Sequence, residues 1–242
     1  MAEALGWAAL AAGSLVIGAW LAFARQWPGE QVGFVLAFGA GALISAVSFE
    51  LIEEAIAIGD TWVAGVGLAV GAFTYYLADS AIARRTESGR GMPGRKAGSG
   101  TGPALALGAF LDGIPEQLVL GIGIAVGDGV SVALLAAIFV SNLPEAIGSA
   151  TAMQSAGTPR HKVLRLWIAV AVICTLAGAI GYAIGDFATD NLKAGIQAFA
   201  AGALLVMLID SMIPEAVRQS GRAAGLLTTL GFALATALSG LS

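Results

Sequence analysis

Long apolar runs separated by short polar breaks dominate the chain. A helix needs about 20 apolar residues to cross a hydrocarbon core of about 30 Å. Eight runs meet this length, at residues 5–23, 32–58, 61–82, 103–126, 130–154, 163–185, 192–217 and 223–241. The pattern predicts an all-α integral membrane protein with eight transmembrane helices, forming a single transmembrane domain over residues 1–242.

Composition supports a membrane location and excludes a soluble domain. Hydrophobic residues make up 57% of the chain and charged residues only 12%, and the mean hydropathy is +0.85. A soluble domain of this size could not bury so much apolar surface. Nucleic-acid binding has no support beyond one short basic loop.

Basic residues lie almost entirely on one side of the predicted spans. They follow the odd-numbered spans, whereas only Lys193 falls on the opposite side. Because short cytoplasmic loops collect Lys and Arg, both termini are expected to face outward. Residues 86–102, rich in Gly, Ser, Arg and Lys, are expected to form a flexible cytoplasmic loop. These features suit a prokaryotic inner (plasma) membrane. The basic residues are Arg25, Arg84, Arg85, Arg90, Arg95, Lys96, Arg160, Lys162, Arg165, Arg218 and Arg222.

The second and seventh spans resemble each other. Residues 37–43 align with 198–204, and the alignment continues without a gap until Glu54 falls on Glu215. The two spans cross the membrane in opposite directions in the predicted topology. The sequence therefore predicts an inverted repeat, with spans one to three related to spans six to eight around a central pair, four and five.

Carboxylates interrupt the apolar helices at an aliphatic-Pro-Glu step that occurs three times, ending in Glu116, Glu145 and Glu215. An ionisable group at bilayer depth costs several kcal/mol and usually faces the protein interior or a water-filled path. Residues four apart share a helix face, so Asp112 should lie with Glu116 and Ser141 with Glu145. Asn142 adds an amide oxygen to this set.

The prolines should supply further oxygen ligands. Pro115 and Pro144 have no N–H, which frees the carbonyls of Leu111 and Val140 and is expected to kink each helix. Inside a bundle, a freed carbonyl needs water or a cation as its partner. The fourth and fifth spans therefore predict an oxygen-rich cation cage.

These residues resemble the ZIP, or Zrt/Irt-like, family of metal transporters, whose fourth and fifth spans carry His-Asn-x-Pro-Glu-Gly-type motifs. The resemblance implies divalent metal transport toward the cytoplasm by alternating access, with no enzymatic activity and no organic cofactor. Membrane lipid and divalent metal ions are the expected partners, and homodimer formation is left open. The implied metal residues are Asp112, Glu116, Ser141, Asn142 and Glu145, with Glu50 and Glu54 in the second span and Asp210 and Glu215 in the seventh.

The chain departs from the family pattern in ways that affect the predicted substrate. Asp112 replaces the motif histidine, and Gly113, at the Asn position, cannot act as a side-chain ligand. His161 falls in a basic cytoplasmic loop, and Cys174 is expected to be a small core residue. Oxygen ligands favour harder ions such as Mn or Fe(II), although Zn, Cd and Co remain candidates.

Alternatives remain for the outer acids and for the whole chain. Glu50, Glu53 and Glu54 could form an acidic mouth, a second metal site or a solvated helix end. Glu215 could instead pair with Arg218. A transport-inactive metal-binding sensor or scaffold is the alternative function, because the motif histidine is missing. An intramembrane protease is disfavoured, because the Gly-Asp pair ending at Asp128 falls in a predicted outer loop.

Overall fold

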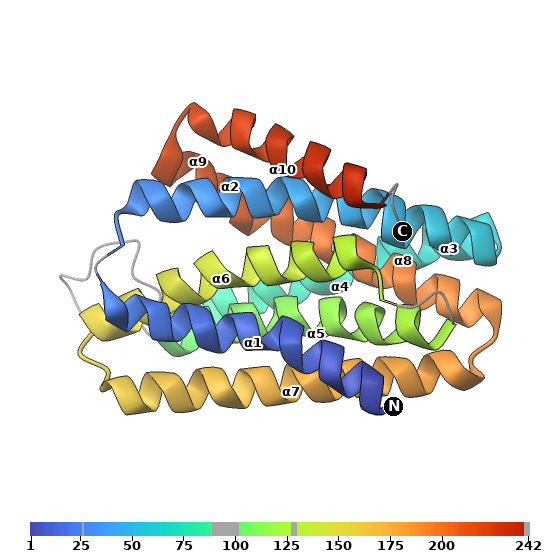
Figure 1. Cartoon of the computed structure of the whole chain (residues 1–242), viewed down its shortest axis with the longest axis horizontal. Coiled ribbons are helices and arrows are strands. Elements are labelled where there is room, and N and C mark those ends of the chain that lie inside the picture. The colour runs from blue at the N-terminus through green and yellow to red at the C-terminus, as the bar shows by residue number, and fades with distance from the viewer. Residues whose placement is uncertain (26, 89–101, 127–129, 240–242) are drawn as a thin grey trace.

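The computed structural model describes residues 1–25, 27–88, 102–126 and 130–239, with side chains described except at 82, 83, 85–88, 102–112, 126 and 186. The described chain is helical throughout, without a strand, and its turns are short (Figure 1). The elements are α1 (Ala2–Ala24), α2 (Gly29–Ala46), η1 (Val47–Ile52), α3 (Glu53–Ile58), α4 (Thr61–Ser88), α5 (Gly102–Val126), α6 (Val132–Ser155), α7 (Arg160–Phe187), α8 (Asp190–Met207), η2 (Leu208–Met212), α9 (Ile213–Ser220) and α10 (Ala223–Ser239).

The predicted all-α membrane fold is confirmed at this level. Within the described residues, six helices are long and apolar enough to cross a membrane, and two shorter apolar helices cover Gly113–Ala125 and Ala223–Ser239. Large apolar side chains on the outer helices point away from the bundle, with Trp62 69% exposed on α4 and Leu226 79% exposed on α10. Such a surface requires lipid around it.

The helices lie roughly along one direction and alternate in sense (Figure 1). The turns from α1 to α2, α6 to α7 and α9 to α10 lie at one end, whereas the two chain ends and the turn from α7 to α8 lie at the other. The most extensive pairings are α5 with α7, α4 with α8, α10 with α2, and α1 with α6.

Two of these pairings are equivalent in detail. Gly41 of α2 lies against the carbonyl of Thr228 in α10, and the aligned Gly202 of α8 lies against the carbonyl of Leu68 in α4. The reciprocal contacts also match, because Gly231 meets the carbonyl of Phe38, and Gly71 meets that of Phe199. A Cβ atom at any of these glycines would collide with backbone, so glycine permits the close approach of the paired helices.

Departures from α-helical bonding occur in the second and seventh spans. The N–H of Glu53 donates to the carbonyl of Ser48, and that of Ile213 donates to Leu208, both five residues back as in a π-helix. These segments begin at Val47 and Leu208, which the repeat alignment places opposite each other. Together with the α-helices on either side, these segments form two continuous helical rods, Gly29–Ile58 and Asp190–Ser220.

The helices that contain the central Pro-Glu steps behave differently. Both α5 and α6 remain α-helical on each side of Pro115 and Pro144. The third step, with Pro214, instead falls at the start of α9, directly after η2. Because α9 continues the rod Asp190–Ser220, Pro214 still lies inside a continuous helix, and its missing N–H leaves a carbonyl of the preceding π-helical turn without its usual donor.

Candidate functional site

Four of the predicted central ligands have described side chains on α5 and α6, two helices that pack against each other. Glu116, Ser141 and Asn142 are buried, at 1%, 1% and 2% exposure, and Glu145 is half-buried. Asp112 lies in α5, but its side chain is outside the described part. A buried carboxylate between two apolar helices is costly unless it serves a partner or a path.

The polar groups on α6 are held differently. The Ser141 hydroxyl donates to the carbonyl of Ile138 at 3.0 Å, which leaves its oxygen able to accept or to bind a cation. The Nδ2 atom of Asn142 is buried and has no hydrogen-bond partner in the described part of the protein. A buried amide without its hydrogen bonds costs about 1–3 kcal/mol. The Asn142 amide nitrogen is therefore available to donate a hydrogen bond to water or to another acceptor.

The space beside Gly113 leaves no room for a larger side chain. A Cβ at Gly113 would lie 2.7 Å from the sulfur of Cys174 in α7, so no larger residue fits at this position without displacing the thiol. Cys174 is buried, as expected for a core residue, and lies near enough to Glu116 for the two groups to interact electrostatically. The thiol thus occupies the space beside the Pro-Glu step that a side chain at residue 113 would need.

A cavity of about 330 Å³ lies between the second span and the central helices α5 and α6. Glu50 of η1 and Glu54 of α3 lie one helical turn apart, and both line this cavity. The α5 wall includes Leu120 and Gly123, and the α6 wall begins at Ser131. The two carboxylates therefore face the helices that carry the central ligands.

Gln197 of α8 completes the cavity lining. It is fully buried, and neither its Oε1 nor its Nε2 has a hydrogen-bond partner among the described residues. Its repeat-aligned residue is Leu36, which is an ordinary buried leucine. Our sequence analysis missed Gln197. The available signal was an amide within an apolar span whose repeat-aligned residue is aliphatic.

The cavity lies close to the central Pro-Glu step along α5. Leu120 of the lining is four residues beyond Glu116, which corresponds to a rise of about 6 Å along the same helix face. On α6, Leu134 of the lining lies two turns before Ser141. The cavity therefore ends about one turn from the buried carboxylate.

The predicted ligands of the seventh span are not part of this arrangement. Glu215 pairs with Arg218 and accepts a hydrogen bond from Gln219, as the expected ion pair at that helix end. Asp210 is exposed and lies near Asp79 of α4. The described side chains contain no cluster of three His, Cys, Asp or Glu residues that could hold a metal. Asp128, weighed for a protease, lies outside the described residues, and His161 is exposed.

Comparison with known proteins gives no further assignment, because no protein-family model matches the chain and no curated protein is significantly similar to it.

Proposed function

We propose that this protein is a divalent metal ion transporter of ZIP type, moving a transition metal of the Zn, Mn or Fe(II) class toward the cytoplasm. One observation carries the proposal: the cavity lined by Glu50, Glu54 and the buried Gln197 ends about one turn from Glu116. Carboxylates and an amide whose oxygen lacks a partner among the described residues, that of Gln197, suit a partly dehydrated cation inside an apolar bundle.

The path begins at the cavity. Glu50 and Glu54 attract the hydrated cation, and Gln197 replaces part of its water shell with an amide oxygen. The metal then passes to the central set, where Glu116 and Asn142 are buried and Glu145 is half-buried. Each transfer exchanges one set of oxygen ligands for another, so the ion is never left without partners.

We also propose eight transmembrane spans related by an inverted repeat. Support comes from the matching π-helices at Val47 and Leu208 and from the matched glycine contacts of α2 with α10 and α8 with α4. Such repeats allow one group of helices to move against another around a site near the midplane. Both termini then face outward, and the ends carrying Arg25 and Arg160 face the cytoplasm.

Metal preference follows from the donors near Glu116. Carboxylate and amide oxygens favour Mn and Fe(II), whereas a thiolate favours Zn and Cd. The buried Cys174 thiol interacts electrostatically with Glu116, and as a thiolate it would add a soft donor to this site. Replacing Cys174 with serine should therefore move the uptake ranking from Zn and Cd toward Mn and Fe(II).

Metal uptake into proteoliposomes tests the proposal, with Zn, Mn, Fe(II), Co and Cd compared in turn. Glu116→Ala and Glu145→Ala should abolish saturable uptake, because each removes a carboxylate of the central site. Glu3→Ala, which alters an exposed acid on α1, is the matched control and should retain native uptake. Size-exclusion profiles establish that each variant is folded.

Two outcomes would reject transport through this site. Saturable uptake that persists in both central variants would place the path elsewhere. Metal binding by the native chain without any flux would favour the sensor or scaffold, which the replacement of the motif histidine by Asp112 supports.

A further inference from the structure

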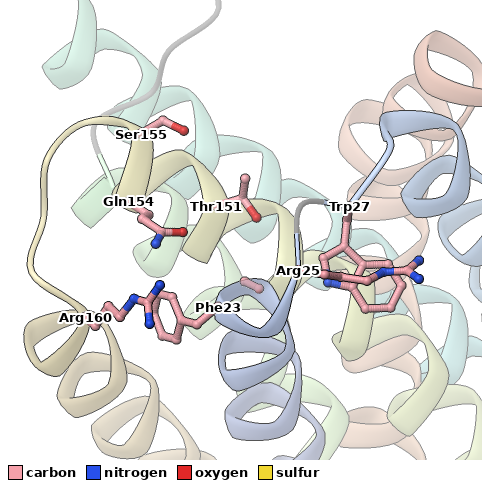
Figure 2. A pocket seen from close by; sticks show the side chains of 8 residues that line it. Phe23, Arg25, Trp27, Thr151, Gln154, Ser155 and Arg160 are labelled. Atoms are coloured by element: carbon pink, nitrogen blue, oxygen red, sulfur yellow. The ribbon is translucent and has the colours of Figure 1, made fainter.

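A second cavity, of about 620 Å³, lies at the opposite end of the bundle from the Glu50 and Glu54 cavity. It lies where α1 and α6 end and α7 begins (Figure 2). Its polar lining consists of donors and neutral groups, with no acidic residue among those described. The chain as a whole is negatively charged, with 16 acidic and 12 basic residues, whereas the described lining of this cavity is positively charged. The polar residues are Arg25, Thr151, Gln154, Ser155 and Arg160.

Both arginines in the cavity are supported by aromatic rings. The Arg160 guanidinium lies 5.5 Å from the centre of the Phe23 ring, and the Arg25 guanidinium lies 4.0 Å from that of Trp27. Arg25 also donates to Gln31. Neither arginine forms an ion pair within the described chain. Stacking orients a guanidinium while leaving its N–H groups at the ring edge free to donate.

The surroundings of Arg160 add donors of the same kind. Figure 2 shows Arg160 below the end of α6, which carries Gln154 and Ser155. Arg160 is the first residue of α7, a helix of 28 residues capped by Pro159. The positive end of that helix dipole and its first N–H groups favour an anion at the same point. A guanidinium, a helix start, an amide and a hydroxyl thus surround one space.

We propose that this cavity binds a phosphate group carried by an anionic phospholipid at the membrane surface. The cavity lies at the ends of membrane-crossing helices, which is the level of lipid headgroups. Arginine binds phosphate through paired N–H donors, and Arg with Trp is typical of the interface. The cavity volume accommodates a glycerophosphate headgroup. This proposal does not depend on metal transport, since no predicted metal ligand lines the cavity.

Native mass spectrometry of the full chain in detergent tests the site, with short-chain phosphatidylglycerol and phosphatidylcholine as probes. We expect phosphatidylglycerol to be retained more strongly than phosphatidylcholine. Arg160→Gln should weaken that retention about tenfold, as expected for loss of one charge-assisted phosphate contact. Arg160→Lys should weaken it less, because it keeps the charge but loses the paired donors.

Arg222→Gln is the matched control, because Arg222 is an exposed arginine at the same end of the bundle that does not line the cavity. It should bind phosphatidylglycerol as the native chain does. Equal binding by the native chain and Arg160→Gln, or an equal loss in Arg222→Gln, would overturn the proposal. Competition with inorganic phosphate identifies the source: displacement at millimolar phosphate means that free phosphate is the ligand, whereas retention means that the lipid is.

Discussion

The rods Gly29–Ile58 and Asp190–Ser220 have the same backbone and different surroundings. Each changes from α- to π-helix at the aligned residues Val47 and Leu208. In the first rod, Glu54 lines a cavity beside α5 and α6, whereas its aligned residue Glu215 is paired with Arg218 at the end of the second. The alignment of these rods therefore predicts backbone geometry better than it predicts the role of a carboxylate.

The difference shows that two rods with the same change in helix type can present different chemistry. A π-helical turn widens the rod and leaves backbone carbonyls without standard partners, which is why such turns are frequent at functional sites. Among the described residues, the first rod combines that turn with two carboxylates that line a cavity beside α5 and α6, Glu50 and Glu54, which are one turn apart. In the second rod, the aligned residue of Glu50 is Ser211, which is exposed.

The prediction with the largest expected effect tests whether the two rods pack equivalently against their partner helices, α10 and α4. Gly41→Ala and Gly202→Ala each place a Cβ against a carbonyl of the paired helix, which cannot rotate away. Each substitution should lower the free energy of unfolding by about 2–3 kcal/mol, as overpacking does. Thermal unfolding followed by circular dichroism in detergent measures the loss as a lower Tm.

Gly65→Ala and Gly225→Ala are the matched controls. These glycines are also aligned with each other, and open space surrounds each added Cβ. They should leave Tm nearly unchanged, within the effect of about 0.5 kcal/mol that is usual for surface substitutions. A large loss at Gly41 with none at Gly202 would break the equivalence of the two rods.

The next prediction tests whether the aligned carboxylates Glu54 and Glu215 differ in their contribution to metal uptake. Glu54→Gln should lower the efficiency of metal uptake about tenfold, equivalent to about 1.4 kcal/mol, because it removes a charge from the cavity. Glu215→Gln should lower it no more than about twofold, because a partly exposed ion pair contributes little. Initial uptake rates in proteoliposomes, normalised to inserted protein, measure both. Similar losses in the two variants would assign Glu215 to the path.

The sequence was sufficient to predict the helices, and it offered the pairing of Glu215 with Arg218, which the structure shows, as an alternative to a metal site. Apolar run length determines the spans, and residues three apart on a helix meet whatever surrounds them. All eight apolar runs are helical in the described residues. The outer acids were also identified, although the sequence left open whether they form a mouth, a site or a solvated end.

The remaining features depend on contacts between distant segments. The approach of Cys174 to Gly113 joins α7 to α5, and no local pattern specifies it. The two π-helices share no local signal, because a proline, Pro214, follows η2 but none follows η1. Gln197 was overlooked because a single amide in an apolar span has no periodicity, and only its place in the cavity gives it a role.

The prediction with the smallest expected effect tests the role of Gln197 in the cavity, by giving the second rod the leucine that the first rod has at the aligned position. Gln197→Leu introduces the side chain found at the aligned Leu36 and removes two buried polar atoms without partners. Stability should stay constant or rise by about 1 kcal/mol, because an unsatisfied amide is lost. The KM for metal uptake should nevertheless rise about threefold, since the cavity loses an oxygen ligand.

Gln117→Leu separates ligand loss from a change in packing. Gln117 is equally buried and its amide atoms also lack partners, but its Oε1 lies against Gly178 of α7, away from the cavity lining. Its substitution should match Gln197→Leu in thermal stability and leave the KM unchanged. If both variants raise the KM for metal uptake alike, Gln197 acts through packing and not as a ligand. The functional difference between the two rods then rests on Glu50 and Glu54 alone.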